Sequence, residues 1–326
     1  MTVAPDDPGL APIAERLASH PRFAGRAIVL RPLAGGLTNR NLLVELDGGT
    51  ERHALRIPGV GTPLLGIVRP IERDAAVAAA EAGVAPAVTG WVTPEGWLVT
   101  ELLAATPVLP ERLAGPDGRR AIGELLRRVH GARAVPALFQ PLRIVELHGI
   151  LAADRGHLAP DAPVIAALLG RLERALAPTA PPLRLCHNDL LAGNILDDGV
   201  RLRLIDWEYA GMGDPYFDLG NLAANHHLDG DAIADVVRAW LGAAPASHEL
   251  ARVRLHRIVS DLREGMWAVL QEVASTLPVD YAAYAAEHLG RAVAMAAARA
   301  TEDDLALVAG GPVPRVPPRM TAGSGA

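Results

Sequence analysis

The feature that most constrains this chain is a short polar segment, followed by a hairpin signal and a strand that ends in aspartate. The segment reads Cys186-His187-Asn188-Asp189-Leu190-Leu191-Ala192-Gly193-Asn194, which gives the spacing His-x-Asp-x-x-x-x-Asn. Asp197-Asp198-Gly199 is typical of a hairpin turn, and the residues from Arg201 to Ile205 alternate as a strand does. Asp206 ends that strand, twelve residues after Asn194. We therefore expect Asp189, Asn194 and Asp206 to converge at one site.

These residue types are the ones that phosphoryl transfer requires. One carboxylate must accept the proton of an attacking hydroxyl, while an amide oxygen and a second carboxylate hold Mg²⁺ against phosphates. Mg²⁺ prefers oxygen ligands and usually binds one or two carboxylates together with phosphate groups. We assign Asp189 as the base, Asn194 and Asp206 as metal ligands, and His187 as a brace of the loop. The alternative is a polar loop joined to a hairpin, because Asp and Asn favour turns through local hydrogen bonds.

The order of predicted elements indicates a small β-rich part followed by a larger helical part. Residues 1–25 are expected to form a flexible lead-in and a short helix. Residues 26–103 contain alternating runs broken at glycine turns, with one alanine-rich helix from Ile71 to Ala82, and indicate an antiparallel sheet. Residues 104–309 are predicted to be mostly helical, and the Gly/Pro-rich residues 310–326 to be disordered. The expected fold class is α+β.

Composition limits the classes of protein that fit. With 326 residues, half of them apolar, the chain is long enough for two lobes. The net charge of -6, without a basic stripe, argues against nucleic acid as a partner. Cys186 is the single cysteine, so no internal disulfide forms. The sequence has no signal peptide pattern and no apolar run of 18 residues, so we expect a cytoplasmic protein without a membrane partner. The oligomeric state stays open.

Two further sequence motifs, called words below, follow the loop: Ile205-Asp206-Trp207-Glu208-Tyr209-Ala210-Gly211 and Phe217-Asp218-Leu219-Gly220-Asn221. Together with the loop, these words resemble the choline and ethanolamine kinases, within the larger group that includes aminoglycoside phosphotransferases. The word Asp-Trp-Glu-Tyr-Ala-Gly is more specific to the choline kinase branch. The resemblance runs from about Leu30 to Arg291 and implies a bilobal, protein-kinase-like fold. It also implies ATP and Mg²⁺ as cofactors and a small amino alcohol as the acceptor.

A glycine-containing segment between two predicted strands is the first candidate for nucleotide binding. It contains Gly35, Gly36, Thr38 and Asn39, and glycines there let backbone amides approach phosphate oxygens. By itself this segment is more typical of a simple hairpin turn. The resemblance adds weight to nucleotide binding, because choline kinase-like proteins carry a similar Gly-Gly-x-Thr-Asn at this place.

Further nucleotide contacts are implied by the position of charged residues in the predicted sheet. Arg56 stands where the kinase fold places its phosphate-binding cation, and arginine can bind phosphate with two hydrogen bonds. Glu72 is its expected orienting partner. Glu101 lies in the segment from Val99 to Leu103, which is expected to cradle adenine through backbone hydrogen bonds. The alternative for the pair is a surface arginine and a glutamate that the helix dipole favours.

Aromatic residues make up 4% of the chain, so their place near the motif is informative. A quaternary ammonium such as choline binds well over ring faces. By the resemblance, Tyr209 and Trp267 are expected to form an aromatic wall, and Glu208 to balance the charge of the substrate. The alternative for Trp267 is packing in the core of an amphipathic helix. One departure concerns Asn225, where choline kinases of higher organisms usually have an acidic residue.

Three functions are therefore compared. The first is an ATP-dependent kinase of a small amino alcohol, with choline preferred over ethanolamine. The second is a kinase of aminoglycosides or of another small molecule, whose polycationic substrates would need a site lined mainly by carboxylates. The third is an inactive nucleotide-binding scaffold, against which the joint presence of Asp189, Asn194, Asp206 and Arg56 argues.

Overall fold

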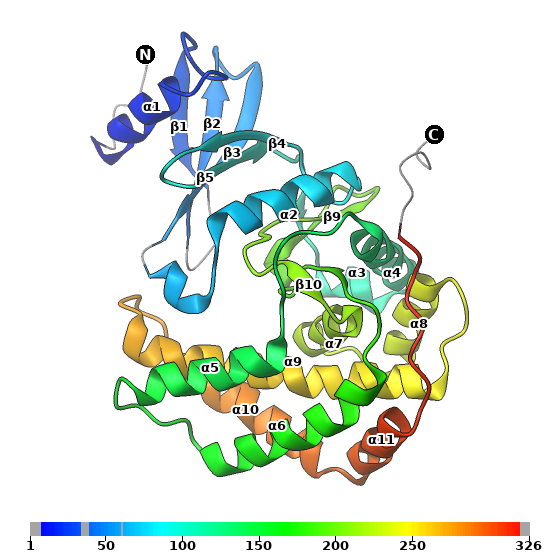
Figure 1. Cartoon of the computed structure of the whole chain (residues 1–326). Coiled ribbons are helices and arrows are strands. Elements are labelled where there is room, and N and C mark those ends of the chain that lie inside the picture. Colours follow the sequence, from blue (N-terminus) through cyan, green and yellow to red (C-terminus); the bar gives the residue numbers. More distant parts are fainter. Residues whose placement is uncertain (1–7, 34–38, 60, 320–326) are drawn as a thin grey trace.

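A computed structural model describes residues 8–33, 39–59 and 61–319, which form two lobes (Figure 1). The N-lobe contains a five-stranded antiparallel sheet with the strand order β1-β2-β3-β5-β4. Its strands are β1 (Ile28–Pro32), β2 (Asn39–Leu46), β3 (Glu51–Pro58), β4 (Val88–Val92) and β5 (Trp97–Glu101). Two helices accompany the sheet, α1 (Ala11–Ala18) and α2 (Arg69–Glu81).

Alternating burial explains how the N-lobe sheet is held. In β2 the side chains of Leu42, Val44 and Leu46 are buried, because successive side chains of a strand point to opposite faces. They belong to one apolar cluster with Leu17 of α1 and Phe23. Helix α2 belongs instead to the core that it shares with the C-lobe, and this places it between the two lobes (Figure 1).

The C-lobe is mainly helical. Its helices are α3 (Pro110–Ala114), α4 (Pro116–Gly131), α5 (Pro141–Ala153), α6 (Ala162–Leu176), α7 (Pro215–Asn225), α8 (Gly230–Leu241), α9 (Ser247–Ala274), α10 (Tyr281–Ala297) and α11 (Arg299–Ala309). None of the helices in the described ranges combines the length and the apolar character needed to cross a membrane. The sheet before a larger helical part confirms the predicted α+β class with two lobes.

Helix α9 is the centre of the C-lobe, and α5, α6, α7, α10 and α11 pack against it (Figure 1). Close packing depends on two glycines. A Cβ at Gly220 of α7 would lie 2.6 Å from the backbone of His256, and one at Gly265 of α9 would lie 2.5 Å from Leu289. At Gly220 the obstacle is backbone, which cannot yield by that much, and at Gly265 it is the side chain of Leu289, which would have to repack, so both positions favour glycine. The close contact with α9 fixes the position of α7, and α7 supports the loop that carries the sequence motif.

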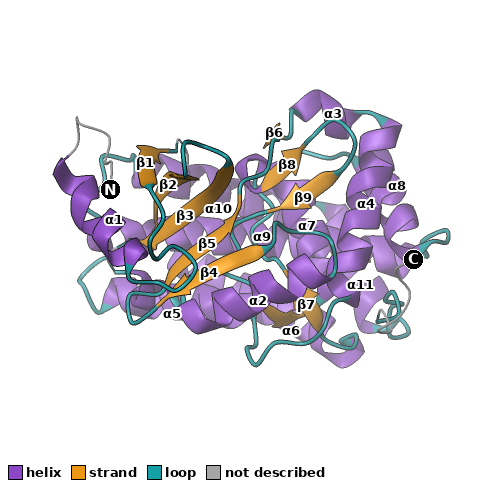
Figure 2. Ribbon diagram, turned by 90° about the horizontal axis from the view of Figure 1, so that it is seen from above, coloured by secondary structure: helices purple, strands orange, loops and turns teal. Residues whose placement is uncertain are grey.

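Two small sheets frame that loop. Strands β7 (Arg184–Cys186) and β10 (Gly211–Gly213) pair on one side of the loop, and β6 (Thr106–Pro107), β8 (Ile195–Asp197) and β9 (Leu202–Leu204) form the other sheet. Figure 2 shows the sheet of β6, β8 and β9 beside α3 and α4, apart from the five-stranded sheet. The β8–β9 pair is the hairpin that the turn at Asp197-Asp198-Gly199 predicts.

The C-terminal segment differs from the sequence prediction. Disorder was expected from residue 310, but residues 310–319 run along the C-lobe near α8 and α11 (Figure 1). Arg315 forms an ion pair of 2.7 Å with the buried Glu249, and its carbonyl oxygen accepts a hydrogen bond of 2.8 Å from the Tyr216 hydroxyl. Residues 310–319, which we call the C-terminal strap, form no helix or strand, but specific polar partners hold them in an extended path.

Candidate active site

The loop between β7 and β8 brings the predicted base and one predicted metal ligand together. Asn194 donates hydrogen bonds from Nδ2 to the backbone oxygen of Asp189 at 2.8 Å and to its Oδ2 at 3.0 Å. Both bonds use the amide nitrogen, so the amide oxygen is the atom that can bind a cation. Burial raises the pKa of Asp189 to about 7, and the nearby Glu264 and Asp206 add to that effect against Arg263. A carboxyl group of this pKa suits proton transfer near neutral pH.

Asp206 follows β9, as the sequence predicts, and its backbone is in the left-handed region with φ of 68°. Asn188, next to Asp189, has a similar φ of 67°. Such φ values are uncommon for residues other than glycine and persist where the surroundings fix them. Asn188 is held by its side chain, which donates to the carbonyl oxygen of Tyr209 at 2.9 Å. Two constrained backbone positions thus orient the two carboxylates, a feature that the sequence did not reveal.

His187 lies under the loop and is fully buried. Its Nε2 is 2.9 Å from the carbonyl oxygen of Ile205, next to Asp206, so the ring connects the loop to the end of β9. Burial lowers the pKa of His187 and keeps the ring neutral. The structure thus places His187 where a brace would lie and away from the reacting groups.

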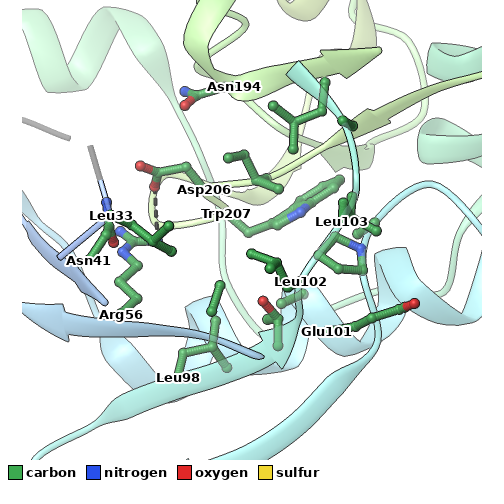
Figure 3. A pocket seen from close by; sticks show the side chains of 18 of the residues that line it. Leu33, Asn41, Arg56, Leu98, Glu101, Leu102, Leu103, Asn194, Asp206 and Trp207 are labelled. Carbon is green, nitrogen blue, oxygen red and sulfur yellow. Dashed lines mark ion pairs between the residues drawn. The ribbon is translucent and has the colours of Figure 1, made fainter. Parts of the chain in front are cut away.

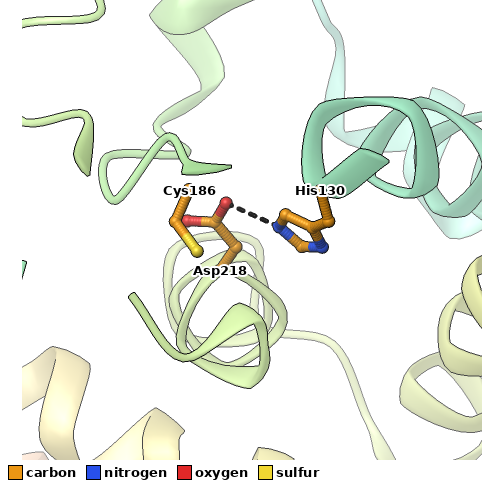
Figure 4. Close-up of side chains that lie close together, drawn as sticks. All are labelled: His130, Cys186 and Asp218. Carbon is orange, nitrogen blue, oxygen red and sulfur yellow. Dashed lines mark hydrogen bonds and ion pairs between the residues drawn. The ribbon is translucent and has the colours of Figure 1, made fainter. Parts of the chain in front are cut away.

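A second buried group ties the loop to α4 and α7 (Figure 4). Asp218 accepts backbone hydrogen bonds from His187 at 2.9 Å and Asn188 at 2.7 Å, and its Oδ2 lies 3.0 Å from His130 Nε2. Cys186 completes the arrangement, which by residue type could hold a metal ion. However, Trp240 donates to His130 Nδ1 at 2.8 Å, and burial raises the pKa of the Cys186 thiol well above its usual value. These partners explain the group as a hydrogen-bonded support of the loop.

Asp206 faces a cluster of charges from the N-lobe. Arg56 lies 2.9 Å from Asp206 Oδ1 and 2.6 Å from Glu72, the orienting partner that the sequence predicts. Arg69, at the start of α2, is a second cation, 2.6 Å from Glu72. Asp206 and Asn194 both line the cavity between the lobes. A carboxylate and an amide oxygen are among the ligand types that Mg²⁺ prefers, so these two residues suit a magnesium site.

Glu208 belongs to this cluster of charges around Arg56. Its Oε2 accepts hydrogen bonds from Arg56, from Arg69 at 3.1 Å and from Asn39 at 3.0 Å. Burial favours the neutral form, but Arg56 and the Asn39 amide outweigh it and lower the pKa of Glu208. The predicted role of Glu208 in balancing a substrate cation is corrected on this ground, because two arginines already balance its charge. Asn39 likewise contacts charged side chains of the cluster.

A cavity of about 400 Å³ lies between the lobes, between β3 and β5 on one side and Asn194 to Trp207 on the other. Figure 3 shows Arg56 and Asp206, joined by their ion pair, on one side and Leu103 and Glu101 on the opposite side. Leu98, Leu196 and Trp207 supply apolar surface. Such a cavity, mostly apolar and with an Arg–Asp ion pair at one end, suits a purine base next to phosphates. Asn41 also lines it, although the sequence analysis did not select this residue.

Three of the predicted nucleotide-binding residues, Gly35, Gly36 and Thr38, lie outside the described residues. Glu101 is exposed at the end of β5, where the segment Glu101–Leu103 lines the cavity. The place of this segment fits the predicted hinge, whose contacts would come from the backbone.

The opposite side of Asp189 faces α9 and α10. Arg263 is 2% exposed, and its Nη1 lies 3.3 Å from Asp189 Oδ1 and also donates to Glu264. Its guanidinium group lies over the Tyr209 ring, 4.4 Å from the centroid. The Tyr284 hydroxyl donates to Glu264 at 3.2 Å, and the Tyr284 ring lies 6.0 Å from that of Trp267. We call these five residues the acceptor cluster: Tyr209, Arg263, Glu264, Trp267 and Tyr284.

The acceptor cluster contains both predicted aromatic residues and three that the sequence analysis did not select. Tyr209 and Trp267 are partly exposed. Arg263, Glu264 and Tyr284 were missed because sequence spacing alone does not indicate which polar side chains of distant helices face the motif; Trp267 was selected by the resemblance. The adjacent charges of Arg263-Glu264, just before the apolar run from Met266 to Leu270, were the available signal, because charges that a helix buries need partners.

The two lobes, the loop with Asp189 and Asn194, and the cluster around Asp206 together define a phosphotransferase with a protein-kinase-like fold. Comparison with known proteins identifies the family within this class. The phosphotransferase enzyme family matches residues 29–256, and the chain belongs to this family, in its choline/ethanolamine kinase branch.

Two relatives and one further structure illustrate the similarity. A crystal structure of a choline/ethanolamine kinase family protein from Mesorhizobium loti is 31% identical, with a TM-score of 0.78, and the match covers 92% of this chain and 99% of that one. Human ethanolamine kinase 2 is 25% identical over 87% of this chain and 80% of its own length. Choline kinase LicA from Streptococcus pneumoniae shares the fold at 23% identity, with a TM-score of 0.72 over 87% of this chain and 97% of that one.

Proposed function

We propose that the protein transfers the γ-phosphate of ATP to the hydroxyl of a small amino alcohol, of the ethanolamine and choline type. The observation that carries the proposal is the position of Asp189 between two sets of side chains. Asn194, which donates to Asp189, lines the interlobe cavity together with Asp206 and Arg56, and Arg263 connects Asp189 to the acceptor cluster. The names of the relatives, ethanolamine kinase 2 and choline/ethanolamine kinase family protein, support an acceptor of this kind.

In this proposal each side chain has one task. Asp189 accepts the proton of the acceptor hydroxyl, and Asn194 fixes the orientation of that carboxylate. Arg56 and Arg69 bind phosphate oxygens at the end of the interlobe cavity, whose apolar walls hold the adenine base. Asn194 and Asp206 would hold Mg²⁺, which when bound neutralises phosphate charge in the transition state. The acceptor cluster orients the amino group, so that the hydroxyl reaches Asp189.

An assay of ATP consumption against a panel of acceptors tests this function. We expect turnover with ethanolamine or choline in the presence of Mg²⁺ and none in excess chelator, because Asn194 and Asp206 need the metal to bind phosphates. The product should be the phosphate ester of the added alcohol. Efficient turnover of kanamycin-type polycations, with none of the amino alcohols, would instead identify an aminoglycoside kinase. Absence of turnover with every acceptor would favour the inactive scaffold.

A further inference from the structure

One guanidinium nitrogen joins the proposed base to a second carboxylate. Arg263 Nη1 lies 3.3 Å from Asp189 Oδ1 and donates a hydrogen bond to Glu264 Oε1. Glu264 is 5% exposed, so this carboxylate has little contact with solvent. Because a single nitrogen reaches both groups, the two carboxylates lie on either side of one guanidinium nitrogen. An amino alcohol that displaces this nitrogen would place its hydroxyl at Asp189 and its ammonium group at Glu264.

The surroundings of Arg263 Nη1 are those of a cation site. The guanidinium group lies 4.4 Å from the centroid of the Tyr209 ring, a distance at which a ring face attracts a cation. The second oxygen of Glu264 accepts from the Tyr284 hydroxyl at 3.2 Å, which holds the carboxylate in place. Trp267 lies edge to face with Tyr284, with ring centroids 6.0 Å apart. A ring face and an oriented carboxylate thus meet at one position, next to the base.

The other acidic side chains near the base are occupied differently. Asp206 and Glu208 belong to the cluster with Arg56 and Arg69 on the phosphate side. Asp261, one turn earlier in α9, pairs with Arg291 and with His288 at 2.9 Å. Within the described ranges Glu264 is therefore the carboxylate that faces both Asp189 and the aromatic rings.

On this basis, and resting on the proposed function, we infer that Glu264 receives the ammonium group of the acceptor and selects amino alcohols that carry N–H donors. The ammonium takes over the contact that Arg263 Nη1 makes with Glu264. A primary ammonium donates hydrogen bonds to the carboxylate, and hydrogen bonds to charged groups are the stronger ones in proteins. A quaternary ammonium has no N–H group, so it gains ring contacts and general attraction alone. Ethanolamine is then preferred to choline, against the preference expected from the sequence.

Kinetics with two acceptors test this inference. The kcat/KM values for ethanolamine and choline are measured at saturating ATP and Mg²⁺ for the wild type, for Glu264→Met and for the control Glu272→Gln. Glu272 lies on the same helix and pairs with His157 at its exposed side, away from the acceptor cluster. The ethanolamine-to-choline ratio of kcat/KM is compared between the variants. A general effect of removing a partner of Arg263 would change kcat/KM for both acceptors by the same factor and leave this ratio unchanged. In Glu264→Met the ethanolamine-to-choline ratio should fall roughly 10- to 150-fold, as loss of a charged hydrogen bond predicts, and in Glu272→Gln it should stay unchanged.

The outcomes separate this inference from the proposed function. A ratio that is unchanged in Glu264→Met, whether both acceptors slow down or neither does, overturns the role of Glu264 and leaves the kinase function intact. If the wild type phosphorylates neither acceptor, the proposed function fails and the inference with it. Thermal unfolding checks that the variant is folded. If Glu264→Met does not fold, Glu264→Gln keeps the size of the side chain and removes its charge. A ratio lowered at least about threefold then supports the inference, since charge-assisted hydrogen bonds are about twice as strong as neutral ones, and an unchanged ratio overturns it.

Discussion

Asp189 is oriented by two neighbours before any substrate binds. Asn194 holds its Oδ2 and Arg263 lies against its Oδ1, while the loop beneath it is fixed by His187 and Asp218. A carboxylate held in this way loses little freedom when a hydroxyl approaches, which is how rigid supports favour catalysis. Its raised pKa keeps its proton affinity near that needed at neutral pH.

Replacement of this carboxylate is the first prediction. Asp189→Asn should lower kcat about 10²- to 10⁴-fold, the usual contribution of a positioned base. Binding of ATP should remain, because Arg56 and the interlobe cavity are unchanged. Rapid-mixing kinetics and nucleotide titration measure the two quantities. The control is Asp117→Asn on the exposed start of α4, which should be neutral. A variant that turns over near the wild-type rate would show that another group is the base.

The second prediction concerns the ring of Trp267, which packs edge to face with Tyr281 and Tyr284 and is partly exposed. Trp267→Ala should raise the KM of the acceptor roughly 2- to 30-fold, since a cation–π contact contributes about 0.5–2 kcal/mol. The KM for ATP should not change, and Trp267→Phe should be milder. If the ring served the core alone, the melting temperature would fall and both constants would change together.

At the scale of residues, the sequence predicted relative positions best where these depend on short spacings. His187, Asp189, Asn194 and Asp206 lie within one loop and hairpin, so their convergence follows from local structure. The contacts of Glu208 were not predicted, because it lies four residues after the end of β9, where the direction of a side chain depends on tertiary contacts such as that with Arg56. Arg263 reaches the site from a helix far along the chain, and a single sequence does not reveal which helix face will meet the loop.

At the scale of elements, strands were easier to predict than the central helix. Alternation of buried and exposed positions marks β2 and the hairpin of β8 and β9. Helix α9 is 28 residues long and buried on almost every side, so it has no exposed polar face to give the usual period. Its polar residues are instead committed to partners in neighbouring elements, and these partners follow from topology alone.

One such contact joins α7 to α9 and provides the third prediction. Asp214 caps α7 by accepting from the backbone of Tyr216 at 3.0 Å, and its other oxygen accepts from Arg252 and from His256 at 3.0 Å. Burial favours the neutral acid, but His256 and Arg252 outweigh it, so the pKa of Asp214 lies well below its usual value. Asp214→Asn should therefore cost about 3–5 kcal/mol of unfolding free energy at pH 7, as expected for a broken buried pair.

The sign of the pH dependence follows from that lowered pKa. The unfolded state takes up its proton near pH 3.9, so the contribution of Asp214 is complete above about pH 5 and declines as the pH falls toward the pKa of the folded state. The difference in melting temperature between wild type and Asp214→Asn should thus shrink between pH 5 and about pH 2. Asp235→Asn, at a more exposed pair on α8, is the control and should cost less than about 1 kcal/mol. An equal difference at every pH would contradict the electrostatic explanation.

For the whole molecule, the C-terminal strap contributes more than its composition suggests. Arg315 contacts the fully buried carboxylate of Glu249, which also accepts from the backbone of Ala246 at the start of α9. Arg184 donates to the carbonyl oxygen of Pro317 at 3.3 Å, so the strap also reaches β7. The last described residues therefore close the C-lobe at the end of its central helix.

Deletion of residues 310–326 is the fourth prediction. It should lower the unfolding free energy by about 3–5 kcal/mol, because Glu249 would remain as a buried charge without its cation. Denaturant unfolding at neutral pH measures this loss. A shorter deletion, of residues 320–326, keeps the contacts of Arg315 and should leave the midpoint unchanged. Equal stability of the two truncated proteins would show that the strap is dispensable.

The charges around Arg56 also determine how far the two lobes can be treated as interchangeable modules. Arg56, Arg69 and Glu72 come from the N-lobe, and Asp206 and Glu208 come from the C-lobe. Each half taken alone would carry charges that only the other half neutralises, and breaking such buried pairs is costly. A chimaera that combines the N-lobe of this protein with the C-lobe of a relative must therefore retain both acidic residues, so the two halves are constrained to change together.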